Sequence, residues 1–336
     1  MKIIFFEVNS AETEILSKLV SDIPGVSAEF FEEKLDEQNL GKAKDAEIVS
    51  VFVNSELKRE IINALPGLKF ISTRSTGFDH VDLAAAKEKG VKVSNVPAYG
   101  AHTVAEFTFA LILSLSRNTY PAYERIKEDD DFDIKGLRGF DLFGKTLGVI
   151  GMGRIGKNVI RIARGFGMNV LAYDIKPDVK FAEETCTKCV SLEDVLAGSD
   201  IVTIHTFLSP ETRHLINKNN IYKMKKGAYL INTARGEIVE TEALLEAVAS
   251  GHLAGAGLDV LEAERQLKDE VHIIKDREAK VRDFKLLYED HVLIDLPQVL
   301  VTPHIAFYTK EAEEEIMKVS VDNIKAFVTG APQNLV

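Results

Sequence analysis

The chain has 336 residues, of which 46% are hydrophobic and 28% charged, so it is long enough for about two globular domains and too apolar for a disordered or fibrous protein. Its formal net charge of −11 does not supply the basic surface that binds nucleic-acid phosphates, so we predict no nucleic-acid partner. We find no cationic leader with an apolar core and no apolar run long enough to cross a bilayer, which predicts a cytoplasmic protein without membrane contact.

Strands and helices alternate over the first part of the chain. Apolar runs predict strands at 3–8, 47–53, 68–73 and 91–96, and periodic segments predict helices at 12–20, 56–65 and 82–89. This alternation is typical of a parallel sheet covered by helices.

The alternation breaks at 97–100, Pro-Ala-Tyr-Gly, and a long helix is predicted at 103–117. That helix is apolar on several faces, which favours burial between domains or subunits. The acidic run at 128–131 is typical of solvated surface.

A second alternating series follows. It predicts strands at 146–150, 169–173, 201–204, 228–232, 254–259 and 299–301, with helices at 157–166, 192–197, 218–224 and 241–250. Six strands with such crossovers make a doubly wound sheet. The connection at 262–296 is long and is expected to contain a helix at 279–288.

A final helix, predicted at 311–327, has little of its own to pack on, so we expect it to return to the first domain. The sequence therefore predicts two interleaved α/β domains. Residues 1–99 and 303–336 would form a substrate domain, and residues 100–302 a nucleotide-binding domain. A cleft crossed by two connections would be suited to closing over a ligand.

A glycine-rich turn joins the strand at 146–150 to the next helix. Gly151, Gly153 and Gly156 have the dinucleotide-binding spacing, in which the glycines permit the turn, the approach of a pyrophosphate and close helix packing. Asp174 ends the next strand, where a carboxylate accepts hydrogen bonds from ribose hydroxyls and repels a 2′-phosphate. The pattern predicts NAD rather than NADP; the alternative is a tight turn without a ligand.

Polar residues follow three strands of the second series, at the sheet edge where ligands of open parallel sheets bind. Arg235 offers a fork of donors for a substrate carboxylate and can polarise a carbonyl. Histidine titrates near neutral pH, so His304 could protonate a carbonyl oxygen as a hydride arrives, with Glu264 orienting its ring. Asp259 could tune this network. Each residue also has a purely structural interpretation, as an ion pair, a strand-end histidine or a backbone cap.

Cys186 and Cys189 form the Cys-x-x-Cys pair of this chain. Such a pair could be a redox centre or half of a zinc site. Because no second pair completes four ligands, we interpret them as two reduced thiols in a short strand or loop and predict no metal.

Four motifs together resemble the NAD-dependent D-2-hydroxyacid dehydrogenase family over nearly the whole chain. They are Gly-Met-Gly-Arg-Ile-Gly at 151–156, Asn-Thr-Ala-Arg-Gly at 232–236, Gly-Leu-Asp-Val-Leu-Glu-Ala-Glu at 257–264 and Thr-Pro-His-Ile at 302–305. The resemblance implies a Rossmann NAD-binding domain inserted into a flavodoxin-like substrate domain. It also implies a homodimer, built largely through the extension that contains the helix at 103–117.

The same resemblance assigns roles to individual residues. It implies Arg235 as the carboxylate binder, Glu264 and His304 as the acid–base pair, and Asp259 as a supporting acid. Substrate-binding residues would be Ser75, Thr76 and Gly77, whose backbone N–H groups can converge on an anion, together with Tyr99 and Tyr308. Cofactor-binding residues would be Gly151, Gly153, Arg154, Ile155, Gly156, Asp174, His205, Thr206, Thr233, Ala234 and Asp259.

Within that family, the segments 97–99 and 304–309 resemble the D-lactate dehydrogenase branch. Tyr99, Phe307 and Tyr308 would line a pocket for a short apolar substituent, although they could equally be packing residues. We predict NADH-dependent reduction of a short 2-keto acid to the D-2-hydroxy acid, with pyruvate to D-lactate favoured. Two departures, Ala101-His102 and the long segment at 265–296, bear on substrate size.

Three alternatives stay open at this point. A D-2-hydroxyisocaproate dehydrogenase or a glyoxylate/hydroxypyruvate reductase would use the same chemistry on another side chain. A formate dehydrogenase is disfavoured, since glutamine would stand where this chain has Glu264. From another class, an NAD(H)-sensing protein like the corepressors of this fold would bind the cofactor and recruit partners.

Overall fold

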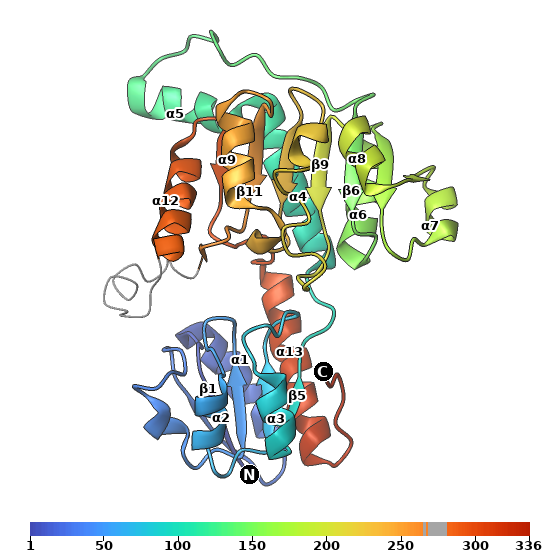
Figure 1. The fold of residues 1–336 in the computed structure, drawn as a ribbon. Helices are drawn as coiled ribbons and strands as arrows, with labels where there is room; N and C mark the ends of the chain where they lie inside the picture. The colour runs from blue at the N-terminus through green and yellow to red at the C-terminus, as the bar shows by residue number, and fades with distance from the viewer. Residues whose placement is uncertain (265–266, 268–280) are drawn as a thin grey trace. The chain divides into compact units, whose positions relative to one another are not determined.

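The computed structural model describes residues 1–264, 267 and 281–336, and their contacts divide the chain into two compact units (Figure 1). Unit 1 comprises Met1–Gly100 and Tyr308–Val336, and unit 2 comprises Ala101–Phe307. The chain therefore leaves the first unit, completes the second and returns to the first. The sequence-based boundaries at 99/100 and 302/303 lie near these division points and remain a proposal for the functional domains.

Unit 1 is built on a five-stranded parallel sheet in the order β2-β1-β3-β4-β5. Its strands are β1 (Lys2–Phe5), β2 (Ser27–Phe30), β3 (Ile48–Val51), β4 (Phe70–Thr73) and β5 (Lys92–Ser94). This order is the flavodoxin-like one. The sequence analysis missed β2, because Ser-Ala-Glu-Phe has no apolar run and lies partly exposed at the sheet edge.

Helices cover both faces of this sheet. They are α1 (Ser10–Ser21), α2 (Arg59–Ala64), α3 (Leu83–Lys89) and α13 (Lys310–Val328), with a 3₁₀ turn η1 (Leu40–Ala43). Ile3 and Phe5 share a core with α1 and α13, whereas Ile4 and Phe6 point to the core under α2 and α3, since side chains alternate along a strand. The final helix packs on α1 and β4, which confirms its predicted return to the first sheet.

Unit 2 is built on a seven-stranded parallel sheet in the order β12-β11-β10-β9-β6-β7-β8. Its strands are β6 (Thr146–Ile150), β7 (Asn169–Tyr173), β8 (Lys188–Cys189), β9 (Ile201–Ile204), β10 (Tyr229–Asn232), β11 (Gly255–Leu258) and β12 (Val299–Val301). The order reverses between β6 and β9, as in the doubly wound Rossmann fold. The two-residue β8 adds a seventh strand to the six predicted ones, and both cysteines are free and exposed.

Two groups of helices pack on this second sheet. Those that cover it are α4 (Ala101–Arg117) and α6 (Arg154–Gly165) on one face, and α8 (Leu192–Gly198), α9 (Thr241–Ala249) and α12 (Val281–Asp295) on the other. Seven side chains of α4 are buried, in agreement with its apolar character. The predicted helix at 279–288 corresponds to α12 from Val281 onward, and its first two residues lie outside the described part.

Three local predictions for unit 2 were wrong or incomplete. The helices α5 (Thr119–Asp129) and α7 (Val179–Glu184) were not predicted: α5 buries none of its residues, and α7 is only six residues long. The segment at 218–224 forms only a 3₁₀ turn, η2 (Ile221–Lys223). The side chains of Asn217 and Asn220 bond to nearby backbone groups there, which competes with an α-helix.

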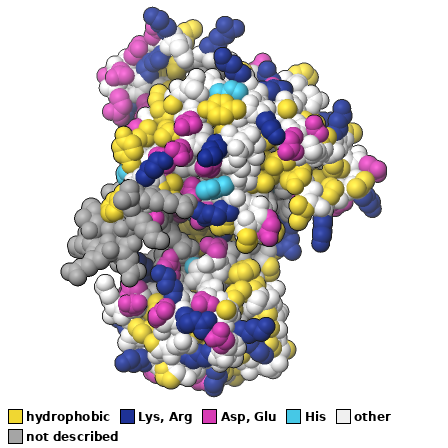
Figure 2. Space-filling model, in the orientation of Figure 1, with side chains coloured by type: hydrophobic (Ala, Val, Ile, Leu, Met, Phe, Trp, Pro, Cys, Tyr) yellow, Lys and Arg dark blue, Asp and Glu magenta, His cyan; other side chains and the backbone are white. Residues whose placement is uncertain are grey.

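On one face of the molecule, charged side chains of both signs lie close together rather than in separate patches (Figure 2). Figure 2 shows basic and acidic side chains intermixed on the face that it presents. In the described part of the chain, no helix combines the length and the apolar character that a membrane span needs.

Arg74, directly after β4, is a buried charged residue that joins three strands of unit 1. Its side chain is 2% exposed; Nη2 donates to the carbonyl oxygens of Phe6 at 2.6 Å and Glu7 at 2.7 Å, and Nη1 donates to Ser50 Oγ at 3.1 Å. Burial lowers the pKa of this guanidinium, an effect that the charge of Glu7 opposes. Arg74 therefore ties the carboxyl ends of β1, β3 and β4 together.

Replacing Arg74 with methionine should lower the free energy of unfolding by about 3 kcal/mol, because buried acceptors lose charged donors. Urea denaturation measures this. Arg59→Met is the control: its side chain is 43% exposed and pairs with Glu88 on the surface, so little change is expected. Equal effects of the two substitutions would contradict the structural role of Arg74.

Candidate active site

The turn between β6 and α6 has the shape that a dinucleotide-binding loop needs. Gly151 has a φ of +99°, and a Cβ atom there would lie 2.6 Å from the carbonyl oxygen of His205. A Cβ at Gly156 would lie 2.0 Å from the carbonyl oxygen of Gly151, whereas a Cβ at Gly153 would meet nothing within 4 Å. The first and third glycines are thus required for packing, and the second leaves its side open for a ligand.

The amino end of α6 follows this opening. Gly153 is the N-cap and offers no side chain to the first N–H groups of the helix, while Arg154 is exposed and Ile155 half-buried in the first turn. Unpaired N–H groups and the helix dipole favour an anion at such an end. The turn therefore fits a pyrophosphate.

Asp174 lies beside this turn, directly after β7. Its Oδ2 accepts a hydrogen bond from the backbone N–H of Met152 at 2.6 Å, and its Oδ1 accepts one from the backbone N–H of Lys176 at 2.8 Å. The carboxylate is partly exposed. These bonds hold an acid at the edge of the glycine turn, the place where the ribose of a dinucleotide is recognised.

His205 supports the same turn from β9. Its backbone N–H donates to the carbonyl oxygen of Ile150 at 2.7 Å, and its Nε2 lies 2.9 Å from Thr203 Oγ1. Nδ1 is buried, with no hydrogen-bond partner among the described residues. Burial lowers the pKa of this imidazole to about 3, so the ring is neutral and brings no positive charge to a phosphate. Thr206, which follows it, is partly exposed.

The strands β10, β11 and β12 end in register, with Asn232 beside Leu258 and Leu258 beside Val301. The segments that carry Arg235, Asp259 and His304 therefore leave the same edge of the sheet. The sequence analysis predicted this edge from the positions of the strands.

A short turn after β10 presents Arg235. Asn232 is 1% exposed; its Oδ1 accepts from the N–H of Ala234 at 3.0 Å, and its Nδ2 donates to the carbonyl oxygen of Arg235 at 2.8 Å. Thr233 Oγ1 lies 3.1 Å from Thr108 Oγ1 on α4. The sequence analysis assigned no role to Asn232, although an asparagine that follows a buried strand is a signal for such a turn.

The Arg235 turn packs directly on the segment that leads to Glu264. A Cβ atom at Gly236 would lie 2.1 Å from the carbonyl carbon and oxygen of Leu261. The side chain of Arg235 donates from Nη1 to the carbonyl oxygen of Ala234 at 2.8 Å. Glycine at 236 therefore allows these two segments of the chain to lie against each other.

Asp259 organises the loop after β12. It is 1% exposed and accepts hydrogen bonds from Thr302 Oγ1 at 2.6 Å and from the backbone N–H groups of Ile305 at 2.9 Å and Ala306 at 2.8 Å. Burial raises the pKa of this carboxyl, and the three hydrogen bonds oppose the rise. Predicted as a cofactor-binding and supporting acid, Asp259 directs its carboxylate to the loop that carries His304.

His304 and Glu264 are paired. Nδ1 of the imidazole lies 2.9 Å from Oε1 and 3.0 Å from Oε2 of Glu264, and the two side chains are 27% and 25% exposed. The backbone N–H of His304 donates to the carbonyl oxygen of Asp259 at 2.9 Å, and its φ is +56°. A ring whose Nδ1 is held in this way presents Nε2 to a reactant.

The predicted substrate-binding residues lie in unit 1. Ser75 Oγ donates to the carbonyl oxygen of Gly77 at 2.6 Å, and Thr76 Oγ1 donates to that of Val96 at 2.8 Å. These hydroxyls are used inside the protein, so an anion at this turn would be bound by backbone N–H groups. Tyr99 is partly exposed and Tyr308 is 58% exposed.

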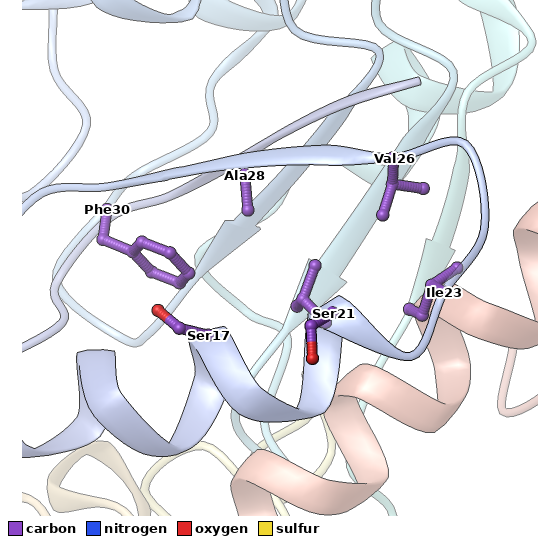
Figure 3. Close-up of a pocket in the computed structure, with 7 residues that line it drawn as sticks. Ser17, Ser21, Ile23, Val26, Ala28 and Phe30 are labelled. Carbon is purple, nitrogen blue, oxygen red and sulfur yellow. The ribbon is translucent and has the colours of Figure 1, made fainter.

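Unit 1 also has a groove between α1 and β2, with a volume of about 240 Å³ (Figure 3). Ser17 and Ser21 line it together with apolar side chains such as Phe30. No titratable side chain belongs to this lining set, so we assign no chemistry to the groove.

Comparisons with known proteins agree with this geometry. A family model described as the NAD binding domain of D-isomer specific 2-hydroxyacid dehydrogenases matches residues 109–306. The 2-hydroxyacid dehydrogenase homolog 1 of Schizosaccharomyces pombe is 39% identical over 98% of this chain and 97% of its own length. The D-lactate dehydrogenase of Escherichia coli is 36% identical over 100% of both chains. The structure of D-lactate dehydrogenase from Aquifex aeolicus complexed with NAD and lactic acid superposes with a TM-score of 0.85, at 37% identity, over 98% of this chain and 96% of that one.

Replacing Asp259 with alanine should leave the Ile305 and Ala306 N–H groups and the Thr302 hydroxyl without their acceptor. We expect a loss of about 3 kcal/mol of unfolding free energy, because buried donors become unsatisfied. Hydrogen exchange of the Ile305 and Ala306 amides should also accelerate. The exposed Asp295→Ala serves as the control; unchanged exchange in the Asp259 variant would show that the carboxylate does not hold the loop.

Replacing Asp174 with alanine should weaken NADH binding by roughly 10-fold, since hydrogen bonds to a charged group are lost. NADPH binding should improve relative to NADH, because the repulsion of a 2′-phosphate is removed. Titration of cofactor fluorescence measures both. Glu183→Ala, an exposed acid of α7, is the matched control, and an unaltered NADH/NADPH ratio would place the ribose elsewhere.

Proposed function

This chain belongs to the D-isomer specific 2-hydroxyacid dehydrogenase family, and on that premise we propose that it reduces a short 2-keto acid to the D-2-hydroxy acid, with pyruvate to D-lactate as its reaction. Its second unit is a Rossmann NAD-binding domain. The observation that carries the proposal is the pairing of His304 Nδ1 with the Glu264 carboxylate at 2.9 Å, at the same sheet edge from which the Arg235 segment leaves.

Arg235 is proposed to bind the substrate carboxylate. Its guanidinium is a permanent cation with donors in a fixed fork, which matches a carboxylate and leaves an N–H to polarise the adjacent keto group. The Asn232 bonds to Ala234 and Arg235 hold the turn that presents this side chain. We further propose that the backbone N–H groups of the turn Ser75–Gly77 contribute to carboxylate binding.

His304 is proposed as the proton donor. Glu264 accepts a hydrogen bond from the Nδ1–H group, which fixes the orientation of the ring so that Nε2 can deliver a proton to the keto oxygen. When bound, NADH supplies the hydride that reduces the keto carbon. In the direction of oxidation, His304 takes the proton back from the hydroxyl group.

The preference for pyruvate rests on the side chains expected at the substrate. Phe307 lies edge-on to the His304 ring, with 6.4 Å between the ring centroids. Tyr99 and Tyr308 are proposed to contact the substrate as well. Bulky side chains favour a substituent as small as a methyl group. A single methylene changes discrimination by only ~1–3 kcal/mol, so 2-ketoisocaproate, glyoxylate and hydroxypyruvate are the competing substrates of the same chemistry.

The assembly is proposed to be a homodimer in the cytoplasm. The helix α5 and the segment after it follow α4 and expose apolar side chains, with Tyr123 at 63%, Phe132 at 82% and Ile134 at 83%. Exposed apolar patches mark interaction sites. This part of unit 2 is therefore the surface that we propose a second copy covers.

Purified protein mixed with NADH and pyruvate should consume NADH, and the decrease in NADH absorbance measures the rate. We expect Arg235→Lys to lower kcat/KM by roughly 10- to 100-fold through loss of the fork, and His304→Asn by ~10²–10⁴-fold through loss of the proton donor. Because reduction takes up a proton, its rate should fall as pH rises. NADH binding should be retained in both variants.

The control is His291→Asn, which changes an exposed histidine of α12 and should leave turnover unaltered. A panel of pyruvate, 2-ketoisocaproate, glyoxylate and hydroxypyruvate identifies the substrate. Tight NADH binding without reduction of any of these acids would reject the enzyme and favour an NAD(H)-sensing binding protein.

A further inference from the structure

Two buried carboxylates hold the backbone that leads into Glu264. Glu262 lies two residues before it, with 3% of its side chain exposed, and Asp290 of α12 is 0% exposed. The proposed chemistry uses neither of them directly. Buried acids are costly unless they are paired or hydrogen-bonded, so their partners indicate what they do.

Asp290 binds the residue next to Glu264. Its Oδ2 accepts a hydrogen bond from the backbone N–H of Ala263 at 2.8 Å, and its Oδ1 lies 3.4 Å from Thr241 Oγ1, at the start of α9. The helix α12 packs on α9 and β12 (Figure 1). Asp290 therefore connects the packed helices α9 and α12 to the peptide that immediately precedes Glu264.

Glu262 fixes the other side of the same peptide. Its Oε1 accepts from Arg213 Nη2 at 3.0 Å and lies 2.7 Å from His214 Nε2, and its Oε2 accepts from Thr241 Oγ1 at 3.2 Å. Residues 262 and 263 are thus bound from the loop after β9, from α9 and from α12.

Charged side chains from its own helix and from neighbouring elements surround Asp290. Glu262 faces it from the segment after β11 and Glu289 from its own helix, while Lys285 pairs with Glu289 and with Glu242 of α9. Burial, together with the charges of Glu262 and Glu289, raises the pKa of Asp290 to about 7, and the Ala263 bond opposes this rise. Asparagine has nearly the same size and shape as aspartate and keeps an oxygen that can accept from the Ala263 N–H.

An apolar side chain at 290 would fill this buried site at a lower cost in desolvation. The presence of an acid at 290 is explained if its role is to hold the Ala263 N–H in one place. Glu264 is the next residue, and its carboxylate has to reach His304 Nδ1 with both oxygens within 3.0 Å. A rotation of the 263 peptide would move the Glu264 side chain away from the ring.

We propose that Asp290 is a positioning residue of the active site, whose carboxyl holds the Ala263 N–H and thereby places Glu264 against His304. The roles of Glu264 and His304 in catalysis rest on the proposed function. The hydrogen-bond relation itself, from Asp290 through Ala263 to the Glu264–His304 pair, is testable without substrate.

The experiment compares Asp290→Leu, which keeps the branching at Cγ but is larger and lacks an acceptor, with Asp290→Asn, which keeps an oxygen for the Ala263 N–H. The readout is the downfield proton resonance of the His304 Nδ1–H bonded to Glu264, assigned by its absence in His304→Asn. We expect the resonance in the wild type and in Asp290→Asn, and its loss or broadening in Asp290→Leu. The kcat of Asp290→Leu should fall by about 10- to 100-fold, with NADH binding unchanged.

Leu293→Ala is the control for general loosening of α12, since Leu293 is a 1% exposed core residue of the same helix with no bond to Ala263. It should keep the resonance. Loss of the resonance in Leu293→Ala, or its retention in Asp290→Leu, would overturn the proposal. Asp290→Ser, whose shorter side chain cannot reach Ala263, replaces Asp290→Leu if that variant does not fold. If the wild type did not reduce any keto acid, the proposed function would be rejected. The positioning role of Asp290 would still be tested separately by the resonance.

Discussion

The carboxylate of Asp259 is the group on which the edge of the second sheet depends. It is almost wholly buried and accepts three hydrogen bonds from the loop after β12, while the carbonyl oxygen of the same residue accepts a fourth from the His304 N–H. One residue at the end of β11 therefore sets the conformation of a loop that starts from the neighbouring strand. Without it, His304 would have no defined position relative to Glu264.

Polar side chains also bind neighbouring backbone groups at other strand ends. Arg74 joins three strand ends of unit 1, Asn232 holds the Arg235 turn, and Asp174 ties the end of β7 to the glycine turn. Each is a polar side chain that satisfies backbone groups which a turn would otherwise leave unpaired. Desolvation makes each one costly, and this cost is offset only in the one conformation in which all partners are in place. The polar groups at the sheet edges thus select a geometry.

Much of the fold follows from local patterns in the sequence. Apolar runs located most strands of both sheets, and the spacing of Gly151, Gly153 and Gly156 located the dinucleotide turn, because one strand or one turn contains the whole signal. Segments whose structure depends on distant partners were missed. The strand β2 is stabilised by pairing with β1 rather than by its own side chains, and α5 has no buried face.

The candidate site divides in the same way. Arg235, Glu264 and His304 could be chosen because they follow strands of one parallel sheet, and the structure brings Glu264 and His304 into contact. Asp290 could not be given a role from sequence, since its partner is a backbone group whose position only the fold defines. For Asp290, that partner lies 27 residues away along the chain.

The backbone conformation at His304 limits which amino acids can occupy this position during evolution. Its φ of +56° lies in the left-handed region, where a side chain branched at Cβ adds strain on the order of 1–2 kcal/mol. Asparagine, aspartate and glycine tolerate that conformation, whereas valine, isoleucine and threonine do not. If histidine at this position were replaced during evolution, the conformation of the loop would therefore restrict its replacement to these few amino acids.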